Sequence, residues 1–540
     1  MNQINTDVLV IGAGVAGLSA ALEAKRLGSK VLLVGKRRAG RSGNSLLAAC
    51  NMTGFEDNDE EQILGLIQDT LRGGGEIGDP ALVETLARNA SAAIQFLEKV
   101  GVRFLREGQG VLRRQAPGHG MRRTVSIEPL YGPVQTAGLA LTLPLLKAVQ
   151  DEQITLLEQH PIIRLMVADG RVHGAIALTP NGEPLKILAR SVVLACGGGG
   201  RLFDHSNNAN DVTGDGLALA FEAGCTLRDL EFVQFHPTMG IHPVRAIFPN
   251  TLFADGAILR NRYGERFLLH HGGIEKDTTR DQMSRAIWEE VAAGRDVRGG
   301  VYLDLSAISS STMRSRYPML CFVLQQNGVQ PEVDWPVVGL TVHFFMGGVR
   351  IDRRAATELP GLYACGEVTG GVHGANRLAG NALLDAVVFG RLAGRSAVED
   401  LSDRPVGQTI SPSIGPLATG QEPLLMQIRE ALRGLLWRHC GVVRNGESLQ
   451  NGLIELNKLE RQFLRCSTEE SPARWYELSG MLISARLLLT AASLREESRG
   501  AHFREDFPYG DDPQWQGSII LQRGAELNDV EHDFVPVVNP

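Results

Sequence analysis

The order of apolar and polar positions at the start of the chain predicts a strand, a helix and a second strand. Residues 7–11 hold β-branched and apolar side chains, and residues 15–27 repeat apolar side chains at helical spacing. A second apolar run follows at 30–34, and Gly-x-Gly-x-x-Gly at 12–17 joins the first strand to the helix. This order predicts a βαβ unit that binds a dinucleotide.

Each glycine of this turn has a physical reason. Gly12 permits the tight turn, Gly14 lets the backbone approach a pyrophosphate, and Gly17 lets the helix pack close to the strand. The helix N-terminus offers N–H groups and positive dipole charge to phosphates. The second strand ends in Gly35 and Lys36, where such sites usually carry an acid for the ribose, so NAD is less favoured and the ribose contact stays unassigned.

Two later apolar runs also end in glycine. Residues 191–196 lead into four glycines at 197–200, and residues 362–365 lead into Gly366 and Glu367. We expect these distant strands to lie in one sheet around a single cofactor.

Residues 420–500 predict a helical region. Its apolar positions follow helical spacing at Leu424, Leu425, Ile428, Leu432, Leu435, Leu436, Leu453, Leu456 and Leu459. Residues 401–420, rich in Pro, Ser and Gly, predict the linker that precedes it.

Composition and charge exclude several classes of protein. The chain has 540 residues, 43% of them hydrophobic, which suits a large core divided into two or three domains. Its net charge of −7 argues against a broad nucleic-acid interface. The seven cysteines are scattered without a CxxC pair, so we predict no zinc or iron–sulfur site and no other metal site.

The location of the protein is predicted from the same observations. Residues 1–7 lack the basic and apolar parts of a secretory signal. No apolar run reaches the ~18 residues of a membrane-spanning helix. An odd, scattered set of cysteines suits a reducing compartment. We therefore expect a cytoplasmic protein without a transmembrane segment, held at a membrane only through a partner.

Six longer motifs resemble one family. They are Thr213–Gly216, Gln234–Thr238, Thr279–Arg285, His343–Gly348, Gly374–Asp385 and Glu497–Pro508. In this order they are similar to the flavoprotein subunit of succinate dehydrogenase and fumarate reductase and to its relative L-aspartate oxidase. The resemblance spans about residues 7–510.

The resemblance implies an α/β fold with a Rossmann-like FAD-binding domain at 1–235 and 345–405. An α+β capping domain is inserted at 236–344, and a helical domain follows at 415–500. Residues 501–540 are expected to form a C-terminal tail.

The same resemblance implies which residues contact FAD. They are Gly12, Ala13, Gly14, Val15, Ala16, Gly17, Lys36, Ser42, Asn44, Ser45, Asp215, Glu367, Ala382 and Leu383. Asp215 and Glu367 are acids at glycine-rich loops, where they would accept from ribityl or ribose hydroxyls. The membrane-bound relatives carry a histidine joined to the flavin where this chain has Asn44, so the FAD is expected to be non-covalent.

The implied catalytic residues are Arg280, His236, His343, Arg377 and Gln234. Arg280 matches the proton-transferring arginine of the family, a role that needs burial and neighbours because an ordinary arginine stays protonated. Arg377 and His343 match its carboxylate clamp, and Gln234 with His236 matches a second substrate-facing pair.

One segment departs from the family. Where the dicarboxylate enzymes carry Thr-Glu-x-x-Arg, this chain has Pro249, Asn250 and Phe253, with Thr251 as a partial replacement. Because these residues gather the second carboxylate, we expect a substrate other than succinate or fumarate. The more apolar segment favours a larger or less charged acid.

Three functions remain open from the sequence. The first is hydride transfer between the flavin and a small carboxylic acid at a C–C bond. The second is amino-acid oxidation, as in L-aspartate oxidase, and the third is a flavin-binding subunit of an electron-transfer complex without substrate chemistry. The candidate electron partners are an iron–sulfur protein, a quinone, a small carrier or dioxygen.

Overall fold

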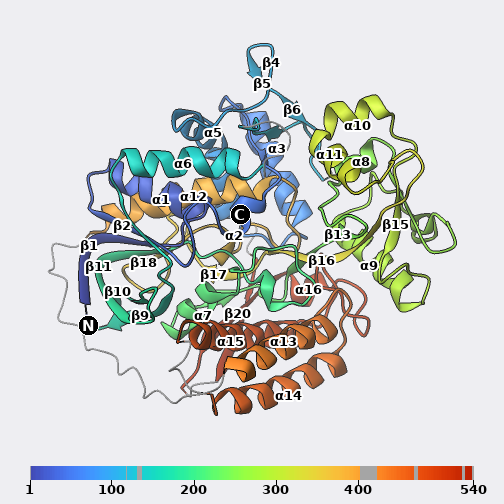
Figure 1. Ribbon diagram of the computed structural model, residues 1–540. Helices are drawn as coiled ribbons and strands as arrows, with labels where there is room; N and C mark the ends of the chain where they lie inside the picture. Colours follow the sequence, from blue (N-terminus) through green and yellow to red (C-terminus); the bar gives the residue numbers. More distant parts are fainter. Residues whose placement is uncertain are drawn as a thin grey trace.

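The computed structural model describes residues 2–116, 118–130, 137–401, 422–466, 472–525 and 529–537 (Figure 1). Residues 402–420 of the predicted linker lie outside the described residues.

The first sheet is assembled from distant parts of the chain. Its strands are β1 (Asn2–Ile11), β2 (Val31–Gly35), β8 (Thr155–Glu158), β9 (Ile162–Ala168), β10 (Arg171–Leu178), β11 (Pro184–Leu194) and β18 (Leu362–Ala364). The order is β8-β2-β1-β11-β10-β9, with β18 paired to β11. β1 runs parallel to both β2 and β11, and β18 is parallel to β11. The prediction that the strands before residues 197 and 366 share one sheet is confirmed.

Two long helices pack on this sheet. α1 (Val15–Arg26) lies against α12 (Asn381–Glu399), and α6 (Leu139–Asp151) also contacts α1. Glycines permit the close approach, because a Cβ at Gly394 would lie 2.3 Å from the carbonyl oxygen of Ala20. The same part of the fold holds α2 (Gly43–Leu47), α3 (Glu60–Gly73), α4 (Pro80–Arg88), α5 (Ala90–Lys99), α7 (Asp215–Glu222), β3 (Asn51–Thr53), β4 (Arg106–Glu107), β5 (Gly110–Val111), β6 (Arg113–Arg114) and β7 (Thr124–Ser126).

The capping region has its own sheet and core. The sheet order is β13-β16-β15-β14, with β13 (Val233–His242), β14 (Ile258–Arg260), β15 (Val301–Asp304) and β16 (Val337–Phe345). Four helices complete it: α8 (Thr251–Ala254), α9 (Arg280–Ala292), α10 (Ser310–Arg316) and α11 (Pro318–Gln326). The chain enters through β13 and leaves through the antiparallel β16, where Val233 pairs with Phe345. The predicted boundaries at 236 and 344 fall on these two strands and stay predictions.

The helical region holds α13 (Glu422–His439), α14 (Gly446–Phe463) and α15 (Pro472–Leu494), which pack against one another below the sheet in Figure 1. Leu425, Ile428, Leu432, Leu435 and Leu436 of the predicted apolar face are all buried.

Helix α15 departs from the expectation that no apolar run reaches the length of a membrane span. Among the described helices it alone is long and apolar enough, with a mean hydropathy of 1.3 over an 18-residue window of which 61% is buried. Its apolar side chains pack against α7, α13, α14 and β20, as expected for a core helix.

The prediction of a C-terminal tail at 501–540 was wrong for much of its length. α16 (Asp512–Trp515) leads into β20 (Gly517–Arg523), which pairs with β21 (Val530–Pro536). β20 also pairs with β12 (Leu227–Arg228), in a five-stranded sheet completed by β17 (Gly348–Arg350) and β19 (Thr369–Gly370). Ile519, Ile520 and Leu521 are buried there, so burial of apolar side chains holds the segment in place.

Candidate active site

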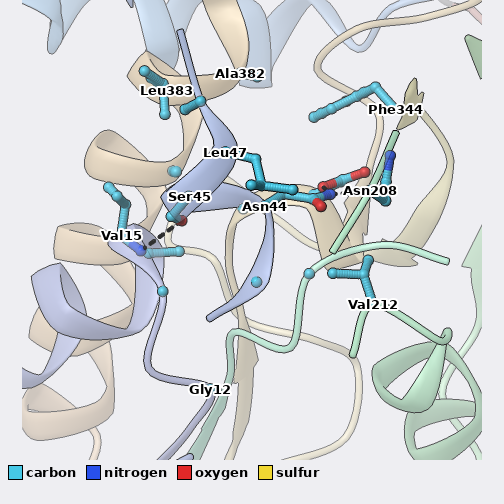
Figure 2. A pocket seen from close by; sticks show the side chains of 18 of the residues that line it. Gly12, Val15, Asn44, Ser45, Leu47, Asn208, Val212, Phe344, Ala382 and Leu383 are labelled. Atoms are coloured by element: carbon cyan, nitrogen blue, oxygen red, sulfur yellow. Dashed lines mark hydrogen bonds between the residues drawn. The ribbon is translucent and has the colours of Figure 1, made fainter. Parts of the chain in front are cut away.

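A cavity of about 350 Å³ lies at the carboxyl ends of the parallel strands (Figure 2). Ile11, Gly35, Ala195 and Cys365, which end or directly follow β1, β2, β11 and β18, all line it. This is the edge at which open α/β sheets bind their ligands. The capping region lines the opposite wall with His236, Ile247, Pro249, Asn250, Thr251, Arg280 and His343.

The glycine-rich turn forms a cradle that side chains would fill. Gly12 has φ of +112°, and a Cβ there would lie 2.1 Å from the carbonyl oxygen of Ala195. Gly12, Ala13, Gly14, Val15 and Ala16 line the cavity at the N-terminus of α1. This turn therefore suits a pyrophosphate.

Gly17 has a different role from the other two glycines. It is absent from the lining in the part of the chain that the structure describes. A Cβ at Gly17 would lie 1.8 Å from the carbonyl oxygen of Gly12, so this glycine lets α1 pack onto the turn. The predicted packing role of Gly17 agrees with this geometry, and its contact with FAD stays a prediction.

Residues after the first helix complete the turn. Ser42, Asn44 and Ser45 line the cavity, and the Ser45 hydroxyl accepts a hydrogen bond from the backbone N–H of Val15 at 3.1 Å, as Figure 2 shows.

Lys36, at the end of β2, is held by acids from two distant segments. Its Nζ lies 2.7 Å from Asp215 Oδ2 and 2.6 Å from Glu477 Oε2 of α15. Burial alone would lower the pKa of Lys36, but the two carboxylates outweigh it and raise the pKa. Glu477 was missed by sequence reasoning, because nothing in the local pattern of a long helix marks a contact with residue 36.

Asn44 and Glu367 meet inside the cavity. Asn44 Nδ2 donates to Glu367 Oε2 at 3.0 Å and to Asn208 Oδ1 at 2.7 Å. Burial raises the pKa of Glu367, opposed by hydrogen bonds from Asn44 and the backbone of Phe345. Asn208 was also missed. The amide of Asn44 has no ring nitrogen, so it cannot form the histidyl bond to flavin.

The N-terminus of α12 points at the same cavity. Gly380, with φ of +89°, caps the helix, and Ala382 and Leu383 of its first turn line the cavity. The positive end of a 19-residue helix here favours a ligand that carries negative charge.

Four predicted catalytic side chains gather at the end of the cavity between the two domains. They are Arg280 at the start of α9, Arg377, His236 on β13 and His343 on β16. The rings of His236 and His343 lie 5.1 Å apart, centroid to centroid. The antiparallel pairing of β13 with β16 positions both histidines.

Gln234 lies behind these groups rather than in the cavity wall. Its Oε1 accepts from Arg280 Nη1 at 3.2 Å and from Arg377 Nη2 at 2.8 Å. Its Nε2 donates to Asn376 Oδ1 at 3.0 Å and to the Arg377 carbonyl at 2.9 Å. Gln234 therefore positions the two guanidinium groups.

The arginines and histidines at this end of the cavity have lowered pKa values. Burial lowers the pKa of Arg280 to about 10. Burial and then the charge of Arg280 lower the pKa of Arg377 to about 9. Burial, followed by the nearby arginines, lowers the pKa of both His236 and His343 well below the usual value, so both are neutral at pH 7. Within the described residues, no carboxylate lies within ion-pair distance of Arg280 or Arg377, although the charges of Glu367 and Asp385 partly oppose the lowering of the Arg377 pKa. The site thus presents two cations to an incoming anion.

Only part of the segment that departs from the family lines the cavity. Pro249, Asn250 and Thr251 line the cavity, whereas Phe253 is 5% exposed and packs in the core of the capping region with Phe248. Position 253 lies on the short α8, and its inner face meets that core.

These residues fit FAD. The cradle at Gly12 and the N-terminus of α1 suit its pyrophosphate, while the acids Asp215 and Glu367 offer acceptors for its hydroxyls. The N-terminus of α12 suits a ring that becomes anionic on reduction.

Comparison with known proteins agrees with this geometry. Residues 7–383 match the FAD binding domain family, and residues 429–539 match the fumarate reductase flavoprotein C-terminal family. One of the subunits of the fumarate reductase (CoM/CoB) of Methanothermobacter marburgensis is 36% identical over 540 residues, covering 96% of this chain and 97% of that protein. The L-aspartate oxidase of Agrobacterium fabrum is 34% identical over 537 residues, with coverages of 97% and 95%.

A solved structure is similar over the whole chain. A variant of FrdA from the E. coli quinol fumarate reductase superposes with a TM-score of 0.87 at 28% identity, covering 99% of this chain and 97% of that one. The cofactor cradle and the cation-rich cavity agree with these matches. The chain therefore belongs to the FAD-binding flavoprotein family of fumarate reductase, succinate dehydrogenase and L-aspartate oxidase, and is an FAD-dependent oxidoreductase.

Proposed function

We propose that the protein transfers a hydride and a proton across the C–C bond beside the carboxylate of a small acid. The observation that carries the proposal is the convergence of Arg280 and Arg377 on Gln234 at the wall of the cofactor cavity, without a carboxylate partner among the described residues. Two desolvated cations at this position attract one carboxylate strongly.

The roles of the side chains follow from their charges. Arg377 binds the carboxylate of the substrate and fixes its orientation, and neutral His343 and His236 donate hydrogen bonds without adding charge. Bound FAD supplies the ring that accepts or releases the hydride.

Arg280 is the proton-transfer residue in this proposal. Its pKa of about 10 lies much closer to neutral pH than that of a solvated arginine, so loss of its proton costs less. Gln234 holds the guanidinium in place during the transfer. In the reducing direction a proton moves from an Arg280 nitrogen to the carbon next to the one that receives the hydride.

The test is anaerobic oxidation of a reduced viologen dye by purified, FAD-loaded protein with a panel of unsaturated acids and an imino acid. Turnover with an unsaturated acid supports the proposal. Turnover confined to the imino acid would favour the oxidase alternative, and no turnover with any compound would favour a flavin-binding subunit.

We also propose that the FAD is held without a covalent bond. The support is Asn44 at the position of the family's flavin-linked histidine. Denaturation with acid should release all of the flavin into the supernatant. Flavin fluorescence that stays with the protein band on a denaturing gel would contradict this.

The proposal also includes an electron partner and a location for the protein. One relative is, by name, part of a larger enzyme, which supports a separate iron–sulfur subunit, quinone or soluble carrier as the partner. We place the protein in the cytoplasm, peripheral to a membrane only through that partner.

A further inference from the structure

The substrate end of the cavity is uneven in charge. Arg280 and Arg377 both donate to one oxygen of Gln234, so their guanidinium groups meet at one place. The remaining wall is formed by Ala116 and Thr124 from the FAD-binding side and Ile247, Pro249, Asn250 and Thr251 from the capping side. None of the six residues of this second wall has a charged side chain. An anionic group therefore meets cations at the two arginines, whereas a second anionic group placed against these six residues would meet none.

Hydrogen bonds fix the capping wall next to His236. The Phe248 N–H donates to the Thr238 carbonyl at 3.0 Å, and the Thr238 hydroxyl donates to the Phe248 carbonyl at 2.7 Å. Thr238 is two residues from His236 on β13 and donates its N–H to the Nδ1 of that ring. Phe248, two residues before Asn250, is thereby tied to the strand that carries His236.

Two polar atoms on this neutral wall lack partners among the described residues. They are the hydroxyl oxygen of Thr124 and the Oδ1 of Asn250, both buried. Thr124 is 8% exposed, and the two come from different domains. Thr251 differs, because its side chain is hydrogen-bonded to Tyr317. Buried polar atoms of this kind are usually satisfied by a ligand or water.

We propose that the substrate carries a single carboxylate and, at its far end, an uncharged hydrogen-bonding group such as a primary amide, which Thr124 and Asn250 recognise. This inference rests on the proposed hydride transfer beside a carboxylate. A second carboxylate would lose its hydration against a wall without a cation. A purely apolar tail would leave Thr124 and Asn250 unsatisfied, whereas an amide offers the donor and the acceptor that the asparagine amide complements.

The experiment compares fumarate, its monoamide and crotonate as acceptors for the FAD-loaded protein, with reduced viologen as the donor. The same three acids are also titrated into the oxidised protein, with the flavin absorbance as the readout of binding. We expect the monoamide to have a kcat/KM at least about tenfold above both others, and the lowest dissociation constant.

Two variants of Asn250 test whether this residue causes the preference for the monoamide. Asn250→Ala should raise KM for the monoamide about tenfold or more, and kcat/KM for the monoamide should fall by a larger factor than kcat/KM for crotonate. Asn250→Lys, which adds the missing cation, should raise kcat/KM for fumarate and lower it for the monoamide. Asn327→Ala, at an exposed asparagine that caps α11 in the same domain, is the matched control and should change neither.

The outcomes separate the two proposals. Fumarate bound and reduced as well as the monoamide, or crotonate preferred over both, would overturn the inference while the proposed hydride transfer stands. If no acid is reduced, the proposed function fails, and the titration still decides the inference through the order of the dissociation constants. Equal monoamide binding by wild type and Asn250→Ala would also overturn it.

Discussion

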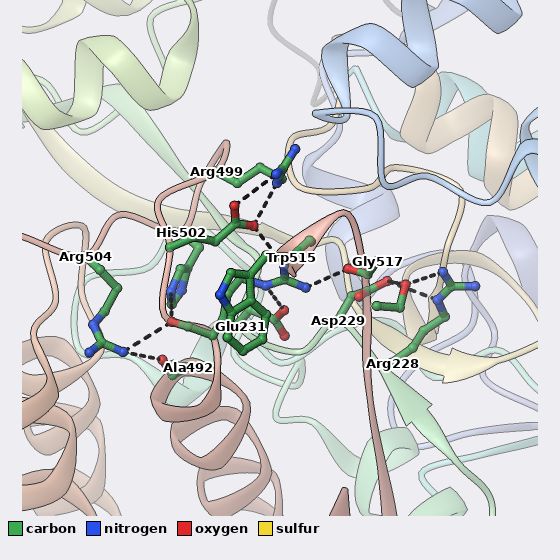
Figure 3. A network of polar contacts seen from close by, with 12 residues as sticks. Arg228, Asp229, Glu231, Ala492, Arg499, His502, Arg504, Trp515 and Gly517 are labelled. Carbon is green, nitrogen blue, oxygen red and sulfur yellow. Dashed lines mark hydrogen bonds and ion pairs between the residues drawn. The ribbon is translucent and has the colours of Figure 1, made fainter. Parts of the chain in front are cut away.

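Two groups of buried or half-buried arginines among the described residues differ in how their charge is balanced. The first holds the C-terminal segment (Figure 3): Arg495, with 0% exposure, has Nε 2.6 Å from Glu231 and Nη1 2.9 Å from Glu497. Glu497 also binds Arg499 at 2.8 Å. The second group is Arg280 and Arg377, which both donate to the amide oxygen of Gln234, while Arg377 also donates to the Leu378 carbonyl at 3.2 Å. The same residue type is paired with acids in one place and left for a ligand in the other.

The difference separates a structural network from a functional site. Buried charges that stabilise a fold require partners, since an unpaired buried ion is costly. Burial raises the pKa of Glu231 to about 7 even though Arg495 opposes the rise. In the active site the cost of burying charge is seen in Arg280 and Arg377, because burial lowers the pKa of both side chains. Such perturbed groups in a cavity are typical of catalytic sites.

The largest expected effect is on catalysis. Arg280→Gln should keep FAD bound and lower kcat by about 10²–10⁴-fold, because a positioned proton-transfer group contributes that much. Arg280→Lys retains the charge and should recover only a small part. Arg262→Gln, at an exposed arginine of the same domain, is the control for both. Near-normal kcat in Arg280→Gln would show that another group moves the proton.

The structural group should respond in stability instead. Arg495→Leu leaves Glu231 without its ion pair and Glu497 with Arg499 alone, and it should lower the free energy of unfolding by about 3–5 kcal/mol, measured by urea denaturation. The exposed pair Arg438 and Glu455 provides the control, since Arg438→Leu should cost no more than about 1 kcal/mol. Equal losses from the two variants would remove the distinction between buried and exposed pairs.

A single substitution should give the two active-site arginines a carboxylate partner, as Arg495 has in the structural network. Gln234→Glu places a carboxylate between Arg280 and Arg377, where it should form ion pairs and compete with the substrate. We expect KM to rise at least ~10-fold, in line with the roughly 1.5–3 kcal/mol of a charge-assisted hydrogen bond, together with a higher Tm. Gln234→Met should raise KM without raising Tm. A lower Tm in Gln234→Glu would contradict the idea of unsatisfied cations.

The smallest effect is on the pH dependence of stability. Burial and then Arg377 lower the pKa of His373 to about 3, and burial followed by Arg444 and Arg495 lowers the pKa of His502 well below its usual value. The folded protein keeps both neutral, while the unfolded chain takes up protons below about pH 6.5. Each histidine should therefore cost roughly 1.4 kcal/mol of stability per pH unit as the pH falls from 6 towards 4.

The variant His373→Leu isolates the contribution of His373 to the pH dependence of stability. The wild type minus variant difference in the free energy of unfolding should change steadily as the pH falls between 6 and 4, with the wild type losing stability relative to the variant. It should be constant between pH 7 and 8, where His373 is neutral in both states. A difference that does not vary with pH would show that His373 titrates normally in the folded protein.

The sequence by itself determined the local elements and the chemistry of the cofactor site. The strand, Gly12 turn and helix spacing fixed a βαβ unit, because backbone geometry alone sets these periods. Motif matches also named Arg280, Arg377, His236 and His343, which the structure brings together at one end of the cavity.

Only the tertiary structure decided which side chains face one another. It placed Gln234 behind the arginines, Phe253 in a core and Glu477 against Lys36, and it turned a predicted tail into the buried strand β20. None of these contacts follows from a local pattern, because each joins segments that are far apart in the chain. Packing of apolar faces brings such segments together, and the partners of a buried charge are set only when those faces meet.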